Sequence, residues 1–81
     1  MARKLGVGII GLGKFGYRCG EILSEMGNDV LGVDSDPTKI KRAQQVLTQT
    51  YEADASDRKV LEQLGFADLS HILVSVGSSI E

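Results

Sequence analysis

Three glycines fall within six residues near the start of the chain, in the stretch IIGLGKFG that spans residues 9–16. They are Gly11, Gly13 and Gly16, and an apolar run precedes them. In the spacing G-x-G-x-x-G the first glycine permits a tight turn, the second lets the backbone approach a pyrophosphate, and the third lets a helix lie close to a sheet. The first-turn N–H groups of that helix would then face the phosphates. The loop therefore predicts a phosphate-binding site, and a strand-to-helix turn without a ligand is the alternative.

The residues between the glycines belong to the same predicted site. Leu12, Lys14 and Phe15 complete the loop, and its backbone amides are the groups expected to meet a ligand. The ammonium group of Lys14 could also reach a phosphate as a point charge, and the alternative for Lys14 is a solvated surface lysine.

An acidic residue follows the loop at the interval typical of a nucleotide-binding fold. Asp34 lies 18 residues after Gly16, where a carboxylate commonly hydrogen-bonds the hydroxyl groups of a ribose. Asp34 ends a second apolar run and Ser35 comes next, so both are placed in the predicted site. A 2′-phosphate there would meet Asp34 and Asp36, and repulsion between like charges disfavours NADP. A capping or loop aspartate is the alternative interpretation of Asp34.

Two more segments are expected on the same rim of the sheet. Asp54 and Ala55 close the third expected strand, where the carboxylate of Asp54 could accept a hydrogen bond from the amino group of an adenine. The alternative is an aspartate that helps to cap the next helix. Val76 and Gly77 end the fourth strand, where a glycine permits close approach of a ligand or simply begins a turn.

The elements that must position these residues alternate along the chain. Strands are expected at residues 5–10, 30–33, 50–53 and 71–76, where short apolar or β-branched runs occur. A helix should follow the glycine loop, because apolar residues recur there at helical spacing and form one stripe that should pack inward. The members of that stripe are Phe15, Cys19, Ile22, Leu23 and Met26.

Residues typical of helix boundaries complete the pattern. Asp36 followed by Pro37 is typical of an N-cap and a first helical residue, and Ser56 or Asp57 should cap a third helix that Gly65 closes. The resulting order βαβαβαβ predicts parallel strands joined by right-handed crossovers, with helices on the faces of the sheet. This is a Rossmann-like α/β fold with strand order 3-2-1-4. Ligands bind such a sheet beyond the carboxyl ends of its strands, at the switch between the first and fourth.

Composition narrows the class of protein. The 81 residues suffice for one domain, residues 1–81, and carry a net charge of −2, which gives no electrostatic reason to bind nucleic acid. The apolar run at residues 5–10 is too short to cross a bilayer, so no membrane insertion is expected. The one cysteine, Cys19, excludes an internal disulfide and fits a reducing cytosol.

Residues suited to catalysis are scarce. A dehydrogenase needs a proton-transfer group near the nicotinamide, but the one histidine, His71, should begin the fourth strand, about five residues or roughly 17 Å from the ligand-binding rim. Cys19 lies in the apolar stripe, and no spacing typical of metal ligands occurs. We therefore expect no enzymatic activity and interpret the nucleotide as a signal.

Several motifs together resemble one family, the TrkA-N domain of potassium-transport regulators, also called the KTN or RCK N-terminal domain. The shared features are a GLGxFG loop, an acid that ends the second strand, an acid-Ala-Thr/Ser step after the third, a Leu-x-x-x-Gly helix end and an apolar fourth strand that closes on glycine. They correspond here to residues 11–16, 33–34, 54–56, 61–65 and 74–77. The resemblance covers nearly all of the chain as the front portion of such a domain, so the fold is expected to be truncated after the fourth strand.

The resemblance implies a regulatory domain that binds an adenine nucleotide. The implied ligand is NAD or NADH, with ATP or ADP as the alternative. The implied location is cytoplasmic, at the inner face of the cell membrane, where such domains form homo-oligomers that control a potassium channel or transporter subunit. Two other classes stay open from the residues alone: the cofactor-binding fragment of a small NAD-dependent dehydrogenase, and a remnant that binds nothing.

Overall fold

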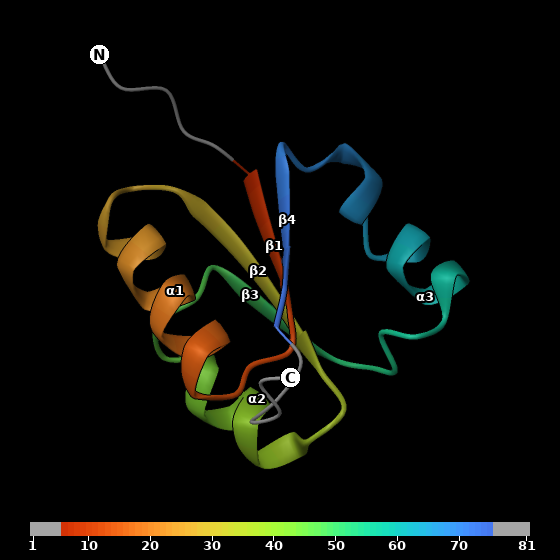
Figure 1. The fold of residues 1–81 in the computed structure, drawn as a ribbon, viewed down its shortest axis with the longest axis horizontal. Helices are drawn as coiled ribbons and strands as arrows, with labels where there is room; N and C mark the ends of the chain where they lie inside the picture. Colours follow the sequence, from red (N-terminus) through yellow and green to blue (C-terminus); the bar gives the residue numbers. More distant parts are fainter. Residues whose placement is uncertain (1–5, 76–81) are drawn as a thin grey trace.

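A four-stranded parallel sheet organises the chain in a computed structural model that describes residues 6–75 (Figure 1). The strands are β1 (Gly6–Ile10), β2 (Asp29–Asp34), β3 (Gln49–Glu52) and β4 (His71–Val74). The helices are α1 (Lys14–Glu25), α2 (Pro37–Ala43) and α3 (Arg58–Gln63), followed by a short 3₁₀ helix, η1 (Phe66–Asp68). The strand order β3-β2-β1-β4 and the parallel pairing confirm the predicted Rossmann-like α/β topology.

The carboxyl ends of the four parallel strands form one rim of the sheet. In Figure 1 the carboxyl ends of β1 and β2 point toward the bottom of the view, where the loop into α1 and the start of α2 lie. The register pairs Ile10 with Val33 on one side and with Val74 on the other. The glycine loop therefore begins at the switch between β1 and β4, where ligands bind in folds of this type.

The main core lies between the sheet and the two helices α1 and α2. Its buried members come from β1, β2, α2 and the loops, and are Val7, Ile9, Leu12, Val30, Ile40, Ala43 and Leu47. Asp36 caps α2 by accepting a hydrogen bond from the Thr38 N–H at 2.9 Å, and Pro37 is its first residue, as predicted. Leu47 is buried and lies beyond the end of α2.

The contact face of α1 differs from the predicted one. Its buried residues are Gly16 and Gly20, whereas Phe15, Ile22 and Met26 of the predicted apolar stripe are 62%, 43% and 69% exposed. A Cβ at Gly20 would lie 2.7 Å from Leu47 and 3.0 Å from Ile9, so the backbone of the helix itself packs on the core. Because the helix contacts the core through its glycines, part of the apolar stripe faces solvent. The expectation that the stripe packs inward is therefore wrong for Phe15, Ile22 and Met26.

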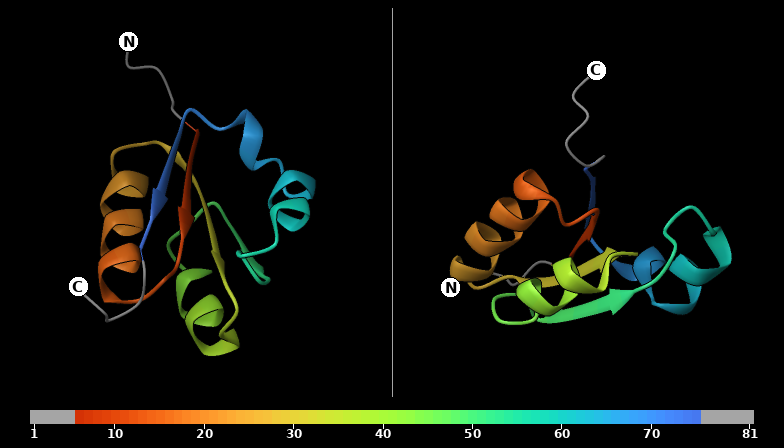
Figure 2. Two further views of the ribbon diagram at one scale, coloured as in Figure 1. Left: turned by 45° about the vertical axis from the view of Figure 1, so that its right-hand side comes forward. Right: turned by 90° about the horizontal axis from the view of Figure 1, so that it is seen from below.

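The opposite face of the sheet is covered by the segment around η1. Phe66 is buried, and a Cβ added at Gly8 would lie 2.7 Å from the Phe66 ring and 2.6 Å from the Leu69 side chain. By contrast, α3 has no buried residue and packs mainly against η1 (Figure 2). The helices were expected on the faces of the sheet, and on this face Phe66 and Leu69 make the contact above Gly8. The predicted N-cap of α3 is confirmed, since Asp57 accepts a hydrogen bond from the Lys59 N–H at 3.0 Å.

Candidate functional site

The glycine loop is a tight turn held against two strands. Gly11 has φ of +96°, and a Cβ on it would lie 1.9 Å from the carbonyl oxygen of Ser75. A Cβ on Gly16 would lie 2.0 Å from the carbonyl oxygen of Gly11. The first glycine therefore makes the turn and the third lets α1 approach it, as the motif predicts. Gly13 has an extended backbone, with φ of −68° and ψ of −169°.

The first turn of α1 presents uncapped N–H groups at this rim. The helix begins at Lys14, and no side chain of residues 6–75 caps it. The earliest backbone bond of the helix runs from the Tyr17 N–H to the Gly13 carbonyl at 2.8 Å. The N–H groups of Lys14, Phe15 and Gly16 precede that bond and so lack intrahelical partners. Together with the positive end of the helix dipole, they form an anion-binding arrangement.

The carboxylate of Asp34 lies across the loop. One oxygen accepts a hydrogen bond from the Leu12 N–H at 2.8 Å, and the other accepts from the Asp36 N–H at 2.9 Å. Asp34 is partly buried at the end of β2. Because a carboxylate oxygen has more than one acceptor site, each oxygen retains capacity for a hydroxyl donor from a ligand. The structure thus brings the predicted loop and the predicted acid together.

The remaining loop side chains are divided between core and solvent. Leu12 is 3% exposed and belongs to the main core, and its N–H already donates to Asp34. It therefore positions the acid, and neither its side chain nor its N–H is presented to a ligand. Lys14, Phe15 and Ser35 are exposed around the rim. The backbone N–H of Leu12 was expected to meet a ligand, and it donates to Asp34 instead.

Asp54 is close to the rim but is engaged in its own turn. Its Oδ1 accepts hydrogen bonds from the Ser56 hydroxyl at 2.6 Å and from the Ser56 N–H at 2.9 Å. These two bonds, that from the hydroxyl first, lower the pKa of the exposed Asp54 carboxyl from its ordinary value. The Ala53 N–H donates to the Asp34 carbonyl at 3.1 Å, which keeps the segment with Asp54 and Ala55 beside the end of β2. Val76 and Gly77 lie outside the described residues.

The one histidine of the chain lies at the end of the sheet opposite the rim. His71 is exposed at the start of β4 and pairs with Val7, at the end of the strand opposite the glycine loop, as predicted. Within residues 6–75, no three His, Cys, Asp or Glu residues are close enough together to hold a metal ion. Among those residues there is also no helix with the length and apolar character needed to span a membrane.

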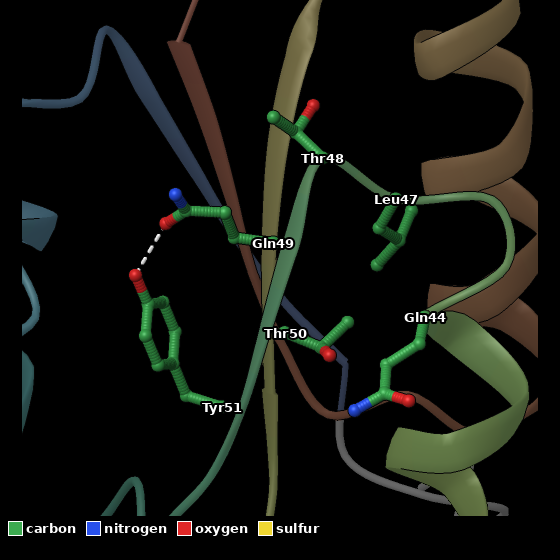
Figure 3. A pocket seen from close by; sticks show the side chains of 6 residues that line it. All are labelled: Gln44, Leu47, Thr48, Gln49, Thr50 and Tyr51. Atoms are coloured by element: carbon green, nitrogen blue, oxygen red, sulfur yellow. Dashed lines mark hydrogen bonds between the residues drawn. The ribbon is translucent and has the colours of Figure 1, made fainter.

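A separate open hollow lies along β3 and the loop that precedes it (Figure 3). Its lining residues are Gln44, Leu47, Thr48, Gln49, Thr50 and Tyr51. The Tyr51 hydroxyl donates to the side-chain oxygen of Gln49. The hollow has no charged lining residue and shares none with the glycine loop or with Asp34. The sequence contained no signal for it.

Comparisons with known proteins agree with the motifs. Residues 7–81 match the family model of the TrkA-N domain. The chain is 33% identical over 73 residues to the Ktr system potassium uptake protein C of Bacillus subtilis (strain 168), and 32% identical over 73 residues to protein A of the same system and strain. It is 26% identical over 72 residues to the Ktr system potassium uptake protein A of Vibrio alginolyticus. These matches include 89–90% of the chain but 33% of each relative, so the chain spans about a third of the length of these relatives.

Proposed function

The chain belongs to the TrkA-N domain family, and from that premise we propose that it is a regulatory domain, residues 1–81, that binds an adenine nucleotide as a signal for potassium transport. The observation that carries the proposal is the arrangement at the rim. Uncapped N–H groups at the start of α1 lie next to a carboxylate that the loop holds in place. A diphosphate and a ribose diol are the neighbouring groups of one ligand that this arrangement fits.

The charges at the rim narrow the choice of nucleotide. Asp34 and Asp36 lie two residues apart, and the Asp36 N–H donates to the Asp34 carboxylate. A 2′-phosphate bound to that ribose would be repelled by both carboxylates, so we expect NAD, NADH, ATP or ADP and not NADP. The exposed Lys14 stands at the first turn of α1, where its ammonium group can approach a phosphate. We also expect the carboxylate of Asp54, or the backbone near Ala55, Val76 and Gly77, to contact the adenine side of the ligand.

We interpret the ligand as a signal and not as a reagent. The distance between His71 and the rim leaves no proton-transfer histidine where a nicotinamide would react. A bound nucleotide can instead favour one arrangement of assembled domains, by as much as its affinities for the two arrangements differ. Because the relatives are named as parts of potassium uptake systems, we propose a membrane potassium transporter as partner, with a homo-oligomer in the cytoplasm at the inner face of the membrane.

Calorimetric titration with NAD, NADH, NADP, ATP and ADP tests this proposal. We expect at least one adenine nucleotide without a 2′-phosphate to bind in the micromolar range and NADP to bind much more weakly, because of the carboxylate repulsion. Preference for NADP, or turnover when a 2-keto acid is added with NADH, would favour a dehydrogenase fragment. The absence of binding heat with all five nucleotides would contradict nucleotide binding by this chain.

A further inference from the structure

The two helices that flank the proposed site are connected at the rim through Asp34. Its carboxylate accepts one hydrogen bond from Leu12, in the loop before α1, and another from Asp36, the N-cap of α2. Elsewhere α1 packs on β1 and β2, α2 packs on β2 and β3, and the two helices have little direct backbone contact. A single attachment at the rim fixes a position but not an angle, so the spacing between the helices depends on side chains further along them.

Tyr17 of α1 and Arg42 of α2 make such a side-chain contact. The guanidinium carbon of Arg42 lies over the Tyr17 ring, 4.2 Å from its centroid. The ring is partly buried against the main core, and Arg42 is exposed in the last turn of α2. A guanidinium at this distance is attracted by the face of an aromatic ring and stacks on it. Within residues 6–75 no carboxylate forms an ion pair with Arg42, so the ring is the group that holds its guanidinium.

The positions of the two residues along their helices connect this contact to both halves of the proposed site. The Tyr17 N–H makes the earliest backbone bond of α1, to the Gly13 carbonyl at 2.8 Å, so Tyr17 directly follows the uncapped N–H groups of the first turn. Arg42 belongs to the short helix whose N-cap, Asp36, donates its N–H to the Asp34 carboxylate. The ring therefore lies on the element that would bind the diphosphate, and the guanidinium lies on the element that positions the acceptor for the ribose.

We propose that the stack of Arg42 on Tyr17 is a positioning contact, which holds the diphosphate half and the ribose half of the site at the spacing of one ligand. This inference rests on the proposed nucleotide site. A ligand that spans two subsites gains from the second one only when both can be engaged at once. Without the stack, α2 would sample other angles, and the fraction of molecules with matched halves would fall. The apparent affinity falls in proportion to that fraction, although neither side chain needs to touch the nucleotide.

Calorimetric titration of ADP and NAD into variants of the two residues tests the positioning role. Tyr17→Leu keeps an apolar side chain on the core but removes the ring, and Arg42→Gln removes the cation. Each should raise the dissociation constant by about two- to fivefold, the factor that corresponds to a cation–π contact at an exposed site. Tyr17→Phe retains the ring and should bind like the wild type. The double variant should bind no more weakly than either single variant, because both changes remove the same contact.

Lys41→Gln is the matched control for the charge of Arg42. Lys41 is the preceding residue of α2, is also exposed, and carries the same charge. If Arg42 acted only by attracting an anionic ligand from a distance, Lys41→Gln would weaken binding by a similar factor. We expect Lys41→Gln to bind ADP and NAD like the wild type. Circular dichroism verifies that each variant is folded at the temperature of the titration.

Ligands that occupy one half of the site give a readout that a general loss of stability would not reproduce. Adenosine lacks the diphosphate and pyrophosphate lacks the ribose, so both should bind Tyr17→Leu and Arg42→Gln as they bind the wild type. Three results would overturn the positioning role: unchanged binding of ADP and NAD in both variants, losses that multiply in the double variant, or an equal loss of pyrophosphate binding in Arg42→Gln. A wild-type chain that binds neither ADP nor NAD would contradict the proposed site itself, and this inference with it.

Discussion

Gly11→Ala should destabilise the fold by about 2–5 kcal/mol. An alanine at φ of +96° costs about 1–2 kcal/mol because its Cβ crowds the backbone in the left-handed region. The Cβ would also lie 1.9 Å from the Ser75 carbonyl oxygen, which is backbone and cannot rotate away. Displacing packed atoms typically costs a further ~1–3 kcal/mol. A domain of this length has a total stability of roughly 4–12 kcal/mol, so urea unfolding followed by circular dichroism should show a large loss.

Gly27→Ala is the matched control for this effect. Gly27 has φ of +93°, close to that of Gly11, but a Cβ on it would meet nothing within 4 Å. It should therefore lose about 1–2 kcal/mol from backbone conformation alone. The difference between the two variants measures the contact between the glycine loop and the end of β4. Equal losses in the two variants would show that this contact is not a tight one.

Asp34→Ala should weaken binding of an adenine nucleotide by about 10- to 100-fold. Hydrogen bonds to a charged group contribute about 1.5–3 kcal/mol each, and the substitution removes the carboxylate proposed to accept from the ribose hydroxyls. It should also narrow the gap between NAD and NADP, because one of the two repelling charges is gone. Calorimetry measures both quantities. The ratio of the two affinities is a readout that a general loss of stability would not change.

Asp36→Ala separates the proposed contact from the local fold. Asp36 caps α2 through the Thr38 N–H, so its loss should cost about 1 kcal/mol of stability. Its N–H, which donates to Asp34, is retained. Binding of NAD or ADP should therefore stay within a few-fold of the wild type. An unchanged affinity in folded Asp34→Ala, or an equal loss in Asp36→Ala, would contradict the role proposed for Asp34.

Local chemistry made much of this architecture predictable. The glycine spacing gave the turn at Gly11, which has φ of +96°, and the approach of α1 at Gly16. Asp36 and Asp57 were identifiable as N-caps, because an aspartate that precedes a helical segment accepts from its first N–H groups. The alternation of strands and helices predicted parallel strands joined by right-handed crossovers, and the glycine spacing after the first strand is typical of the order β3-β2-β1-β4 that the structure has.

The errors arose where packing depends on distant residues. Hydrophobic periodicity indicated the apolar stripe of α1 as its buried face, but the helix packs on the core through Gly16 and Gly20. A Cβ at Gly20 would meet Leu47 and Ile9, and one at Gly16 would meet the carbonyl group of Gly11 and Ile9. Phe66 covers the opposite face from a 3₁₀ turn, an element too short to produce a periodic pattern. Likewise, the hydrogen bond from the Leu12 N–H to Asp34 joins residues 22 positions apart, and no local motif reports it.

An amide-resolved ¹H–¹⁵N NMR titration with ADP and NAD observes the very N–H groups that we propose to bind the phosphates. We expect the largest changes in chemical shift at the amides of Lys14, Phe15 and Gly16, which start α1 without a side-chain cap. Smaller changes are expected at Asp34 and Asp36. Saturable binding that shifts Gln49, Thr50 and Tyr51 instead, and leaves the first turn of α1 unmoved, would contradict this proposal.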